Sequence, residues 1–291
     1  MNKIEKVYFD HNATTRVDDE VLDAMMPYFQ NRFGNPSSGH NLGIAGRQAI
    51  NQAREQVADS IEAQPSQVVF TSGGSEANNL FIQGVAGHLK NSRIIISAIE
   101  HPCVLRPAKE LAQSTNKECG LRQLIVDRSG RIIMSDVDKA LSEYPPNIVS
   151  VMLANNETGV IQEVANIAEK SRKLDALIHT DAIQAFGKIP VSFPSLNVHA
   201  MTLSSHKIYG PKGAAALIID KEIVLRPQIF GGGHEGGLRS GTENVPAIVG
   251  FGKACELSKL RMEKTTIHVT KLRTHLEKRL IEMGAIIFGM N

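Results

Sequence analysis

The sequence predicts an α/β protein with a doubly wound, mostly parallel sheet, followed by an incomplete small α+β domain at the C-terminal end. Three observations support this fold class. Short apolar runs alternate with amphipathic stretches over residues 68–219. The runs are apolar throughout, which is typical of strands covered on both faces. Polar and glycine-rich segments follow the runs directly, at the place where ligands bind in such sheets.

Seven apolar runs are the expected strands. They occupy residues 68–71, 94–97, 124–126, 148–153, 176–179, 201–203 and 214–219. Helices are expected from about Glu76, after Pro102 and near Ile167. A long helical pattern over residues 245–283 is expected to contain a break, and a strand is expected over residues 285–288. Such a lone strand has no partner in the rest of the chain, which predicts an unfinished domain.

The predicted division has three parts. They are an N-terminal arm over residues 1–15 that contributes to the small domain, a large domain over 16–250 and a partial small domain over 251–291.

The formal net charge of +2 gives no electrostatic case for binding nucleic acid or a membrane surface. No apolar run approaches the ~20 residues of a membrane span, and the N-terminus lacks the apolar core of a signal peptide. We therefore expect a cytoplasmic protein.

The three cysteines form no pair with metal-ligand spacing, so no metal site is expected. They are Cys103, Cys119 and Cys255. An odd number of thiols without a CxxC motif fits a reducing compartment.

Lys207 is the strongest candidate for a catalytic residue. It lies in the segment 204–213, SSHKIYGPKG, directly after an apolar run. A lysine that forms a Schiff base with pyridoxal phosphate (PLP) needs a rigid anchor at a strand end. Ser204 and His206 supply a hydroxyl and an imidazole that can bind phosphate. We therefore predict that the chain binds PLP through Lys207; the alternative is an ordinary surface lysine.

Asp181 ends another apolar run and is the second candidate. A carboxylate there can pair with the pyridinium nitrogen of PLP and keep it protonated, so that the ring accepts electrons from a carbanion at Cα. Gln184 follows three residues later and could donate to the ring hydroxyl. The alternative for Asp181 is a cap of the next helix.

Gly74 and Ser75 lie where a strand joins a helix, and His101 follows the next strand. Backbone N–H groups of small residues at a helix N-terminus can bind a phosphate; the alternative is a plain capped helix start. The imidazole of His101 could stack on the pyridine ring, although a lone histidine is more often structural.

Asn156 and Thr242 complete the set of candidates. Asn156 lies in an Asn-Asn pair after a strand and offers an amide for a ring oxygen or a substrate carboxylate; the alternative is an Asn-rich turn. Thr242 ends the glycine-rich segment 231–242 and offers a hydroxyl and a backbone N–H; the alternative is a flexible connector.

Together these motifs resemble those of the cysteine desulfurases of the NifS/IscS type, within the class-V aminotransferases of the fold-type I PLP enzymes. The matching segments run in family order over residues 8–15, 34–38, 71–79, 100–101, 155–159, 180–184, 204–213 and 231–242. The resemblance implies conversion of L-cysteine to L-alanine by a homodimer. The sulfur would remain as a persulfide on an enzyme cysteine and pass to an iron–sulfur scaffold protein or another acceptor.

The resemblance also implies a role for each candidate residue. Lys207 would form the Schiff base and act as the Cα base. Asp181 would bind the pyridine nitrogen, His101 would stack on the ring and Gln184 would contact the ring hydroxyl. The phosphate would be held by Gly74, Ser75, Ser204 and His206. Asn156 would contact the cofactor or substrate, and Thr242 would reach the phosphate of the other subunit.

One part of the family pattern is missing. The family's nucleophilic cysteine, and the arginine that binds the substrate carboxylate, belong to a part of the pattern later than Asn291. Cys103 lies at an expected helix start, which would favour a thiolate, but nothing ties it to the substrate sulfur. Three hypotheses remain: a fragment of a longer desulfurase, an inactive PLP-binding dimer or scaffold-interacting protein, and a different PLP chemistry on an amino acid.

Overall fold

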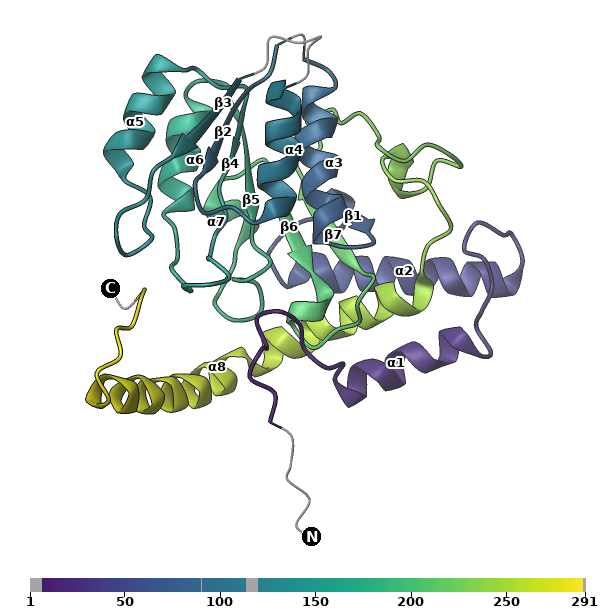
Figure 1. Ribbon diagram of the computed structural model, residues 1–291. Helices are drawn as coiled ribbons and strands as arrows, with labels where there is room; N and C mark the ends of the chain where they lie inside the picture. The colour runs from purple at the N-terminus through teal and green to yellow at the C-terminus, as the bar shows by residue number, and fades with distance from the viewer. Residues whose placement is uncertain (1–6, 90, 114–119, 290–291) are drawn as a thin grey trace.

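The computed structural model describes residues 7–89, 91–113 and 120–289. Within these ranges seven strands form one sheet in the order β1-β7-β6-β5-β4-β2-β3 (Figure 1). They are β1 (Val68–Thr71), β2 (Arg93–Ser97), β3 (Gly120–Leu124), β4 (Ile148–Ser150), β5 (Leu177–Asp181), β6 (Ala200–Ser204) and β7 (Ala215–Ile219). Neighbours run parallel from β3 across to β6, and β7 is antiparallel to β6 and β1. The predicted mostly parallel α/β sheet is confirmed.

Helices cover both faces of this sheet. They are α1 (Asp19–Phe29), α2 (Asn41–Asp59), α3 (Gly74–Ala86), α4 (Pro102–Gln113), α5 (Met134–Glu143), α6 (Val164–Arg172), α7 (Phe193–Leu196) and α8 (Val245–Glu282), with short 3-10 turns η1 (Pro65–Gln67), η2 (Ser205–Lys207) and η3 (Glu235–Gly237). Val69 and Ile94 belong to one hydrophobic cluster, and Val68 and Ile95 to another. Successive strand residues point to opposite faces, so the two clusters are the two sides of the sheet.

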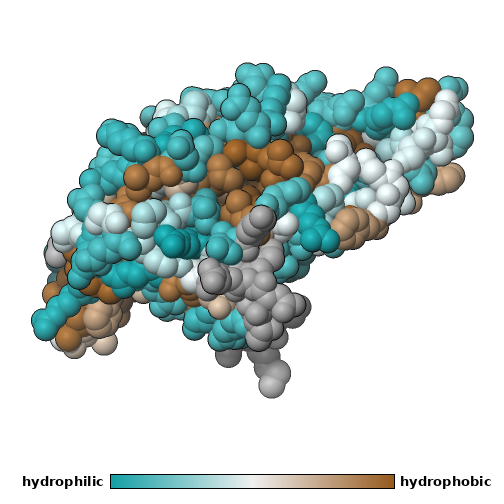
Figure 2. Space-filling model, turned by 90° about the horizontal axis from the view of Figure 1, so that it is seen from above, coloured by the Kyte–Doolittle hydropathy of each residue, from teal (hydrophilic) through white to brown (hydrophobic). Residues whose placement is uncertain are grey.

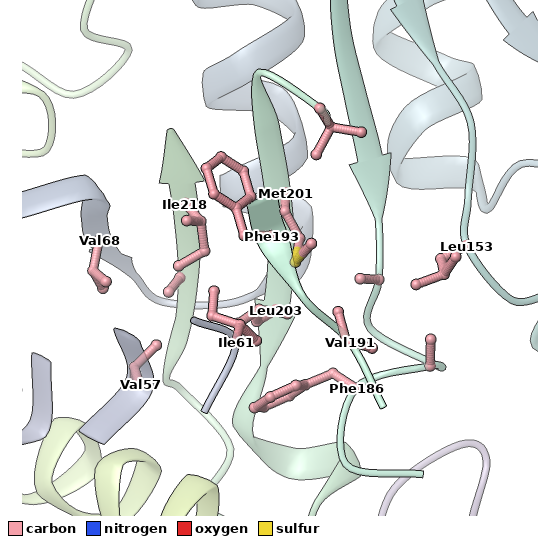
Figure 3. Close-up of a cluster of buried hydrophobic side chains, with 14 of the residues drawn as sticks. Val57, Ile61, Val68, Leu153, Phe186, Val191, Phe193, Met201, Leu203 and Ile218 are labelled. Carbon is pink, nitrogen blue, oxygen red and sulfur yellow. The ribbon is translucent and has the colours of Figure 1, made fainter. Parts of the chain in front are cut away.

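The larger cluster anchors β6. Figure 3 shows Met201 and Leu203 of β6 and Ile218 of β7 among the buried side chains, together with Ile61 and Phe193. Burying a side chain of this size stabilises the fold by about 1.5–3 kcal/mol. β6, the strand that leads into η2, is therefore fixed both by the burial of its side chains and by its hydrogen bonds to β5 and β7.

Two expected strands differ from the observed ones. A strand is predicted over residues 124–126, but β3 ends at Leu124. β3 is an edge strand with mostly half-buried side chains, so it lacks the apolar run that marks a central strand. The predicted strand over residues 148–153 is too long, because β4 ends at Ser150.

The predicted break in the last helix is wrong. α8 is one continuous helix of 38 residues, and neither Gly nor Pro occurs between Gly252 and Gly284 to interrupt it. Its first half packs against α1 and α2, and its second half extends past the sheet (Figure 1). Large apolar side chains from residue 260 onward are exposed, namely Leu260, Ile267, Val269, Leu272 and Leu276.

The strand predicted over residues 285–288 is also wrong. That segment is irregular and ends in a turn, because none of the described strands lies beside it to supply hydrogen bonds. The division into an arm, a large domain and a partial small domain stays a prediction. α8 crosses the predicted boundary at residue 250 without interruption.

Figure 2 shows the molecule from above, turned by 90° from the view of Figure 1. Hydrophilic side chains cover most of this face, around a hydrophobic area near its centre. Within the described ranges, every helix is too short or too polar to cross a membrane.

Candidate active site

The predicted site residues gather at one edge of the sheet. β5 ends at Asp181, and β6 ends at Ser204 and continues into η2, which ends at Lys207. β5 and β6 are parallel neighbours, so their carboxyl ends lie together. α3 begins at Gly74, and His101 directly precedes α4. The sheet therefore brings together residues that are more than 100 positions apart in the sequence.

Asp181 is a buried carboxylate with only 5% of its surface exposed. It accepts hydrogen bonds from Nδ2 of Asn78 at 2.8 Å and from the backbone N–H of Ile183 at 3.0 Å. Burial raises the pKa of Asp181, while these two hydrogen bonds and the positive charges of His101 and Lys207 act in the opposite direction. Asn78 is fully buried on α3. The sequence analysis missed it, since an Asn inside an otherwise apolar helix face was the only signal.

The side chain of Lys207 reaches the N-terminal segment. Its Nζ donates to the carbonyl oxygen of Ala13 at 2.9 Å and also to that of Asn12. Burial lowers the pKa of Lys207, and the carboxylates of Asp10 and Asp181 oppose that change. A lowered pKa makes the uncharged amine more accessible at neutral pH, which a nucleophile or a base requires.

The N-terminal segment is tied to the turn that carries His206. The backbone N–H and Oγ1 of Thr15 both donate to the carbonyl oxygen of His206, at 3.0 and 2.9 Å. The imidazole Nδ1 of His206 lies 3.2 Å from Oγ1 of Thr14. Residues 12–15, which carry part of the resemblance but no predicted role, therefore form one wall of the site.

Gln184 and Asn156 also contact this wall through Asn12. Nε2 of Gln184 donates to the carbonyl oxygen of Asn12 at 2.9 Å, and its Oε1 accepts from Nζ of Lys188 at 2.6 Å. Nδ2 of Asn12 donates to the carbonyl oxygen of Asn156 at 3.4 Å. Asn12 and Lys188 were not predicted as site residues.

His101 contacts Cys103 in the first turn of α4. Nδ1 of His101 accepts from the backbone N–H of Cys103 at 3.2 Å and lies 2.8 Å from its Sγ. The same sulfur accepts from Nδ2 of Asn78 at 3.0 Å and lies 4.0 Å from Oδ2 of Asp181. These contacts join His101 to Asp181 through Cys103, both directly and by way of Asn78.

The expectation that the helix start favours a Cys103 thiolate is wrong. Burial, followed by the nearby carboxylate of Asp181, raises the pKa of Cys103 to about 12. Cys255 is fully buried on α8, and burial raises the pKa of its thiol as well. Cys119 lies outside the described residues.

The predicted phosphate-binding residues lie at two neighbouring turns. A Cβ on Gly74 would come within 2.2 Å of Cδ1 of Ile183, so with any other residue here the tip of the Ile183 side chain would have to move. Ser204 is 1% exposed, and its Oγ has no hydrogen-bond partner among the described residues. Ser75 lies in the first turn of α3.

Thr242 lies apart from the other predicted residues in the described chain. It is exposed in the loop between η3 and α8. Two ion pairs hold η3 and this loop: Glu235 of η3 pairs with Arg54 at 2.7 Å, and Arg239 of the loop pairs with Glu76 at 2.8 Å.

Comparison with known proteins decides the family. The model of the class-V aminotransferase family matches residues 7–290. A cysteine desulfurase IscS of Dictyoglomus turgidum is 42% identical over 284 residues, which cover 96% of this chain and 71% of that protein. The chain belongs to the cysteine desulfurases of the class-V aminotransferase family.

Solved structures agree with this assignment. A NifS-like protein matches this desulfurase chain with a TM-score of 0.92 and 39% identity, over 96% of this chain and 77% of that one. The structure of SspA in complex with cysteine matches with a TM-score of 0.82 and 39% identity, over 86% of this chain and 72% of that one. The predicted family resemblance and fold class are confirmed.

PLP is the cofactor of this desulfurase family, and the residues present fit it. A cofactor with a basic ring nitrogen, an aldehyde and a phosphate needs a carboxylate, an amine and hydrogen-bond donors. Asp181 and Lys207 supply the first two at adjacent strand ends. The unpartnered Oγ of Ser204 is a buried donor at the same edge.

Two buried titratable groups of the desulfurase site were not predicted. Glu100 accepts from Oγ of Ser97 at 2.5 Å and from the backbone N–H of Met152 at 2.8 Å, and burial raises its pKa to about 8. His179 lies two residues before Asp181 and stacks on Phe81 with ring centroids 4.8 Å apart. Burial lowers the pKa of His179 to about 3, so it supports β5 as a neutral ring.

Proposed function

We propose that this protein binds PLP through Lys207 and uses it to remove the Cα proton of L-cysteine, as the first part of a cysteine desulfurase reaction. The observation that carries the proposal is the placement of a buried carboxylate, Asp181, and a half-buried amine, Lys207, at the ends of two adjacent parallel strands. Each has an electrostatic influence on the other. A structural lysine and a structural aspartate have no need of this placement.

The other predicted residues would hold the cofactor around these two groups. When bound, PLP supplies an electron sink for negative charge at the substrate Cα. Asp181 would bind the ring nitrogen, His101 would stack on the ring and Gln184 would donate to the ring hydroxyl. Asn156 would contact the cofactor or the substrate. The phosphate would be bound by Gly74, Ser75, Ser204 and His206.

The reaction requires a particular protonation state of Asp181 and of Lys207. Asp181 must be ionised to pair with a protonated ring nitrogen, and its hydrogen bonds from Asn78 and Ile183 favour the ionised form against the effect of burial. Lys207 must be uncharged to accept the Cα proton, and burial favours that form. The two groups therefore provide a fixed negative charge and a base in one site.

The sulfur step requires a thiol acceptor. In the proposed reaction L-cysteine and a protein thiol give L-alanine and a persulfide on that thiol, so no external oxidant is needed. The persulfide sulfur would then pass to an iron–sulfur scaffold protein. Cys103 and Cys255 do not fit the acceptor, because burial raises the pKa of both thiols and the thiolate is the nucleophile.

This property of the two described cysteines favours a second candidate function. A chain that binds PLP but transfers no sulfur would act through dimerisation or scaffold contacts. The two candidates differ in one measurement, which is the release of sulfide from L-cysteine in the presence of a reductant.

We further propose a cytoplasmic homodimer. Exposed apolar side chains gather on α1 and the loop after it, including Phe29 and Phe33, and Phe230 is exposed on the glycine-rich loop. Ser37 and His234 join these two loops, with Oγ and Nε2 3.3 Å apart. In the proposed dimer, the exposed Thr242 would reach the phosphate of the other subunit. The unpaired Cys103 and Cys255 fit a reducing compartment.

The cofactor proposal is tested by adding PLP to the apoprotein and recording visible absorption. The wild-type protein is expected to develop the absorption band of a lysine Schiff base. Lys207→Ala should lose this band, whereas Lys212→Ala, which changes an exposed lysine five residues away, should retain it. Absence of the band in the wild-type protein, or its persistence in Lys207→Ala, would refute the proposal.

A further inference from the structure

Two lysines of the site converge on one residue. Nζ of Lys207 donates to the backbone carbonyl oxygen of Asn12, and Nζ of Lys188 lies 3.1 Å from the side-chain Oδ1 of the same residue. Gln184 completes the arrangement, because it bonds to the Asn12 carbonyl through Nε2 and to Lys188 through Oε1. Lys188 is therefore connected to Lys207 by a single intervening residue.

The surroundings of Lys188 are unusual for a lysine. It is half-buried, and within the described part of the chain it forms no salt bridge. Its hydrogen-bond acceptors are the neutral amide oxygens of Gln184 and Asn12. Burial, followed by the charge of Lys207, lowers the pKa of Lys188 to about 8. An ammonium group without a counterion in this position costs stability, which a purely structural role would not require.

We propose that Lys188 is a positioning residue for the active site. It fixes the side-chain amide of Gln184 and the side chain of Asn12, and as a cation beside Lys207 it favours the uncharged amine of Lys207. This inference rests on the proposed function, since it concerns the protonation of Lys207 and the orientation of Gln184 before PLP binds.

The orientation of Gln184 follows from the hydrogen bonds. An amide has one donor end and one acceptor end, and Lys188 can bind only the acceptor end because an ammonium group has no acceptor. Oε1 of Gln184 is therefore held toward Lys188, and Nε2 is the end presented toward Asn12 and Lys207. A donor to a ring hydroxyl must have this orientation. The Asn12 carbonyl oxygen, which can only accept, selects the same orientation, so Lys188 adds a second contact that holds the amide this way round.

The effect on Lys207 follows from the charges that face it. Burial favours its uncharged form, and the carboxylates of Asp10 and Asp181 favour its protonated form. Lys188 and Lys207 repel each other as cations, which is the second cause of the lowered pKa of Lys188; by Coulomb's law the same repulsion acts on Lys207. The neighbouring imidazole of His206 has its own pKa lowered by burial, then by Lys207 and Lys212, so it adds little positive charge. Removing the charge of Lys188 should reduce the fraction of uncharged Lys207 at neutral pH about three- to tenfold.

The test measures Lys207 in the apoprotein. Acetic anhydride labels uncharged amines, and mass spectrometry of the peptide that contains Lys207 gives the extent of labelling from neutral to alkaline pH. Lys188→Met should move the labelling curve to higher pH and slow labelling at neutral pH about three- to tenfold. Lys188→Arg keeps the charge and should follow the wild-type curve. Lys173→Met is the matched control, because it removes an exposed lysine that pairs with Glu169.

A wild-type labelling curve in folded Lys188→Met would overturn the charge role, as would an Arg variant that behaves like the Met variant. If Lys188→Met does not fold, Lys188→Gln provides the same comparison.

The orientation role is read from PLP dissociation constants in a double-mutant cycle of Lys188→Met and Gln184→Leu. Additive losses would overturn this role, and non-additive losses support it. Failure of PLP binding in the wild type would contradict the proposed function, yet leave the labelling result valid.

Discussion

Glu100→Gln should change how the stability of the protein depends on pH. Glu100 is buried beside the loop that carries His101, and burial raises its pKa from 4.5 to about 8. A carboxyl group with a raised pKa binds its proton more tightly in the folded than in the unfolded protein. Its stabilising effect is therefore complete below pH 4.5 and is lost as the pH rises through about 8.

The magnitude follows from the two pKa values. Each unit of difference corresponds to about 1.4 kcal/mol, so the wild-type protein should lose about 4 kcal/mol of unfolding free energy relative to Glu100→Gln between roughly pH 5 and pH 9. The substitution preserves the hydrogen bonds from Ser97 and Met152, because Glu100 accepts both through Oε1 and glutamine keeps that oxygen. The Oε2 that becomes an NH₂ group has no partner among the described residues.

The assay is urea unfolding of the apoproteins, followed by circular dichroism at several pH values. Glu110→Gln is the matched control, since Glu110 is exposed on α4, and its stability should parallel that of the wild type. A constant difference between wild type and Glu100→Gln across the pH range would refute the reasoning, because it would mean that Glu100 has the same pKa in the folded and unfolded protein.

Two further substitutions test contacts that hold the site in place. Gly74→Ala should cost about 1–3 kcal/mol of unfolding free energy and weaken PLP binding, because the added Cβ meets Cδ1 of Ile183. Ile183→Val removes that atom and should restore both in the double variant; no recovery would contradict the clash. Arg54→Met should cost about 3–5 kcal/mol, since it leaves the carboxylate of Glu235, 3% exposed, without its partner. Glu235→Gln in the same chain should recover much of this loss in urea unfolding, and equal losses in both variants would contradict it.

The sequence predicted one edge strand of the sheet well and the other poorly. β1 matches its prediction at both ends, because its run VVFT is buried throughout. The prediction for β3 was misplaced, because this strand is mostly half-buried and its polar residues interrupt the apolar run. The predicted break in α8 failed for a related reason. Its second half lacks the periodic burial that makes a helix recognisable, yet no residue in it ends the helix.

By itself the sequence determined the family, the sheet and the residues with the chemistry of a PLP site, since strand ends, a lysine and an aspartate can be read from local pattern. Only the tertiary structure decided the hydrogen-bond partners and the pKa values of these groups. The bond from Asn78 to Asp181 and the convergence of Lys188 and Lys207 on Asn12 join residues 103 and more than 170 positions apart. The high pKa of Cys103 likewise depends on burial and on Asp181, which local sequence does not contain. Proton affinities depend on distance and desolvation, and both are set by packing.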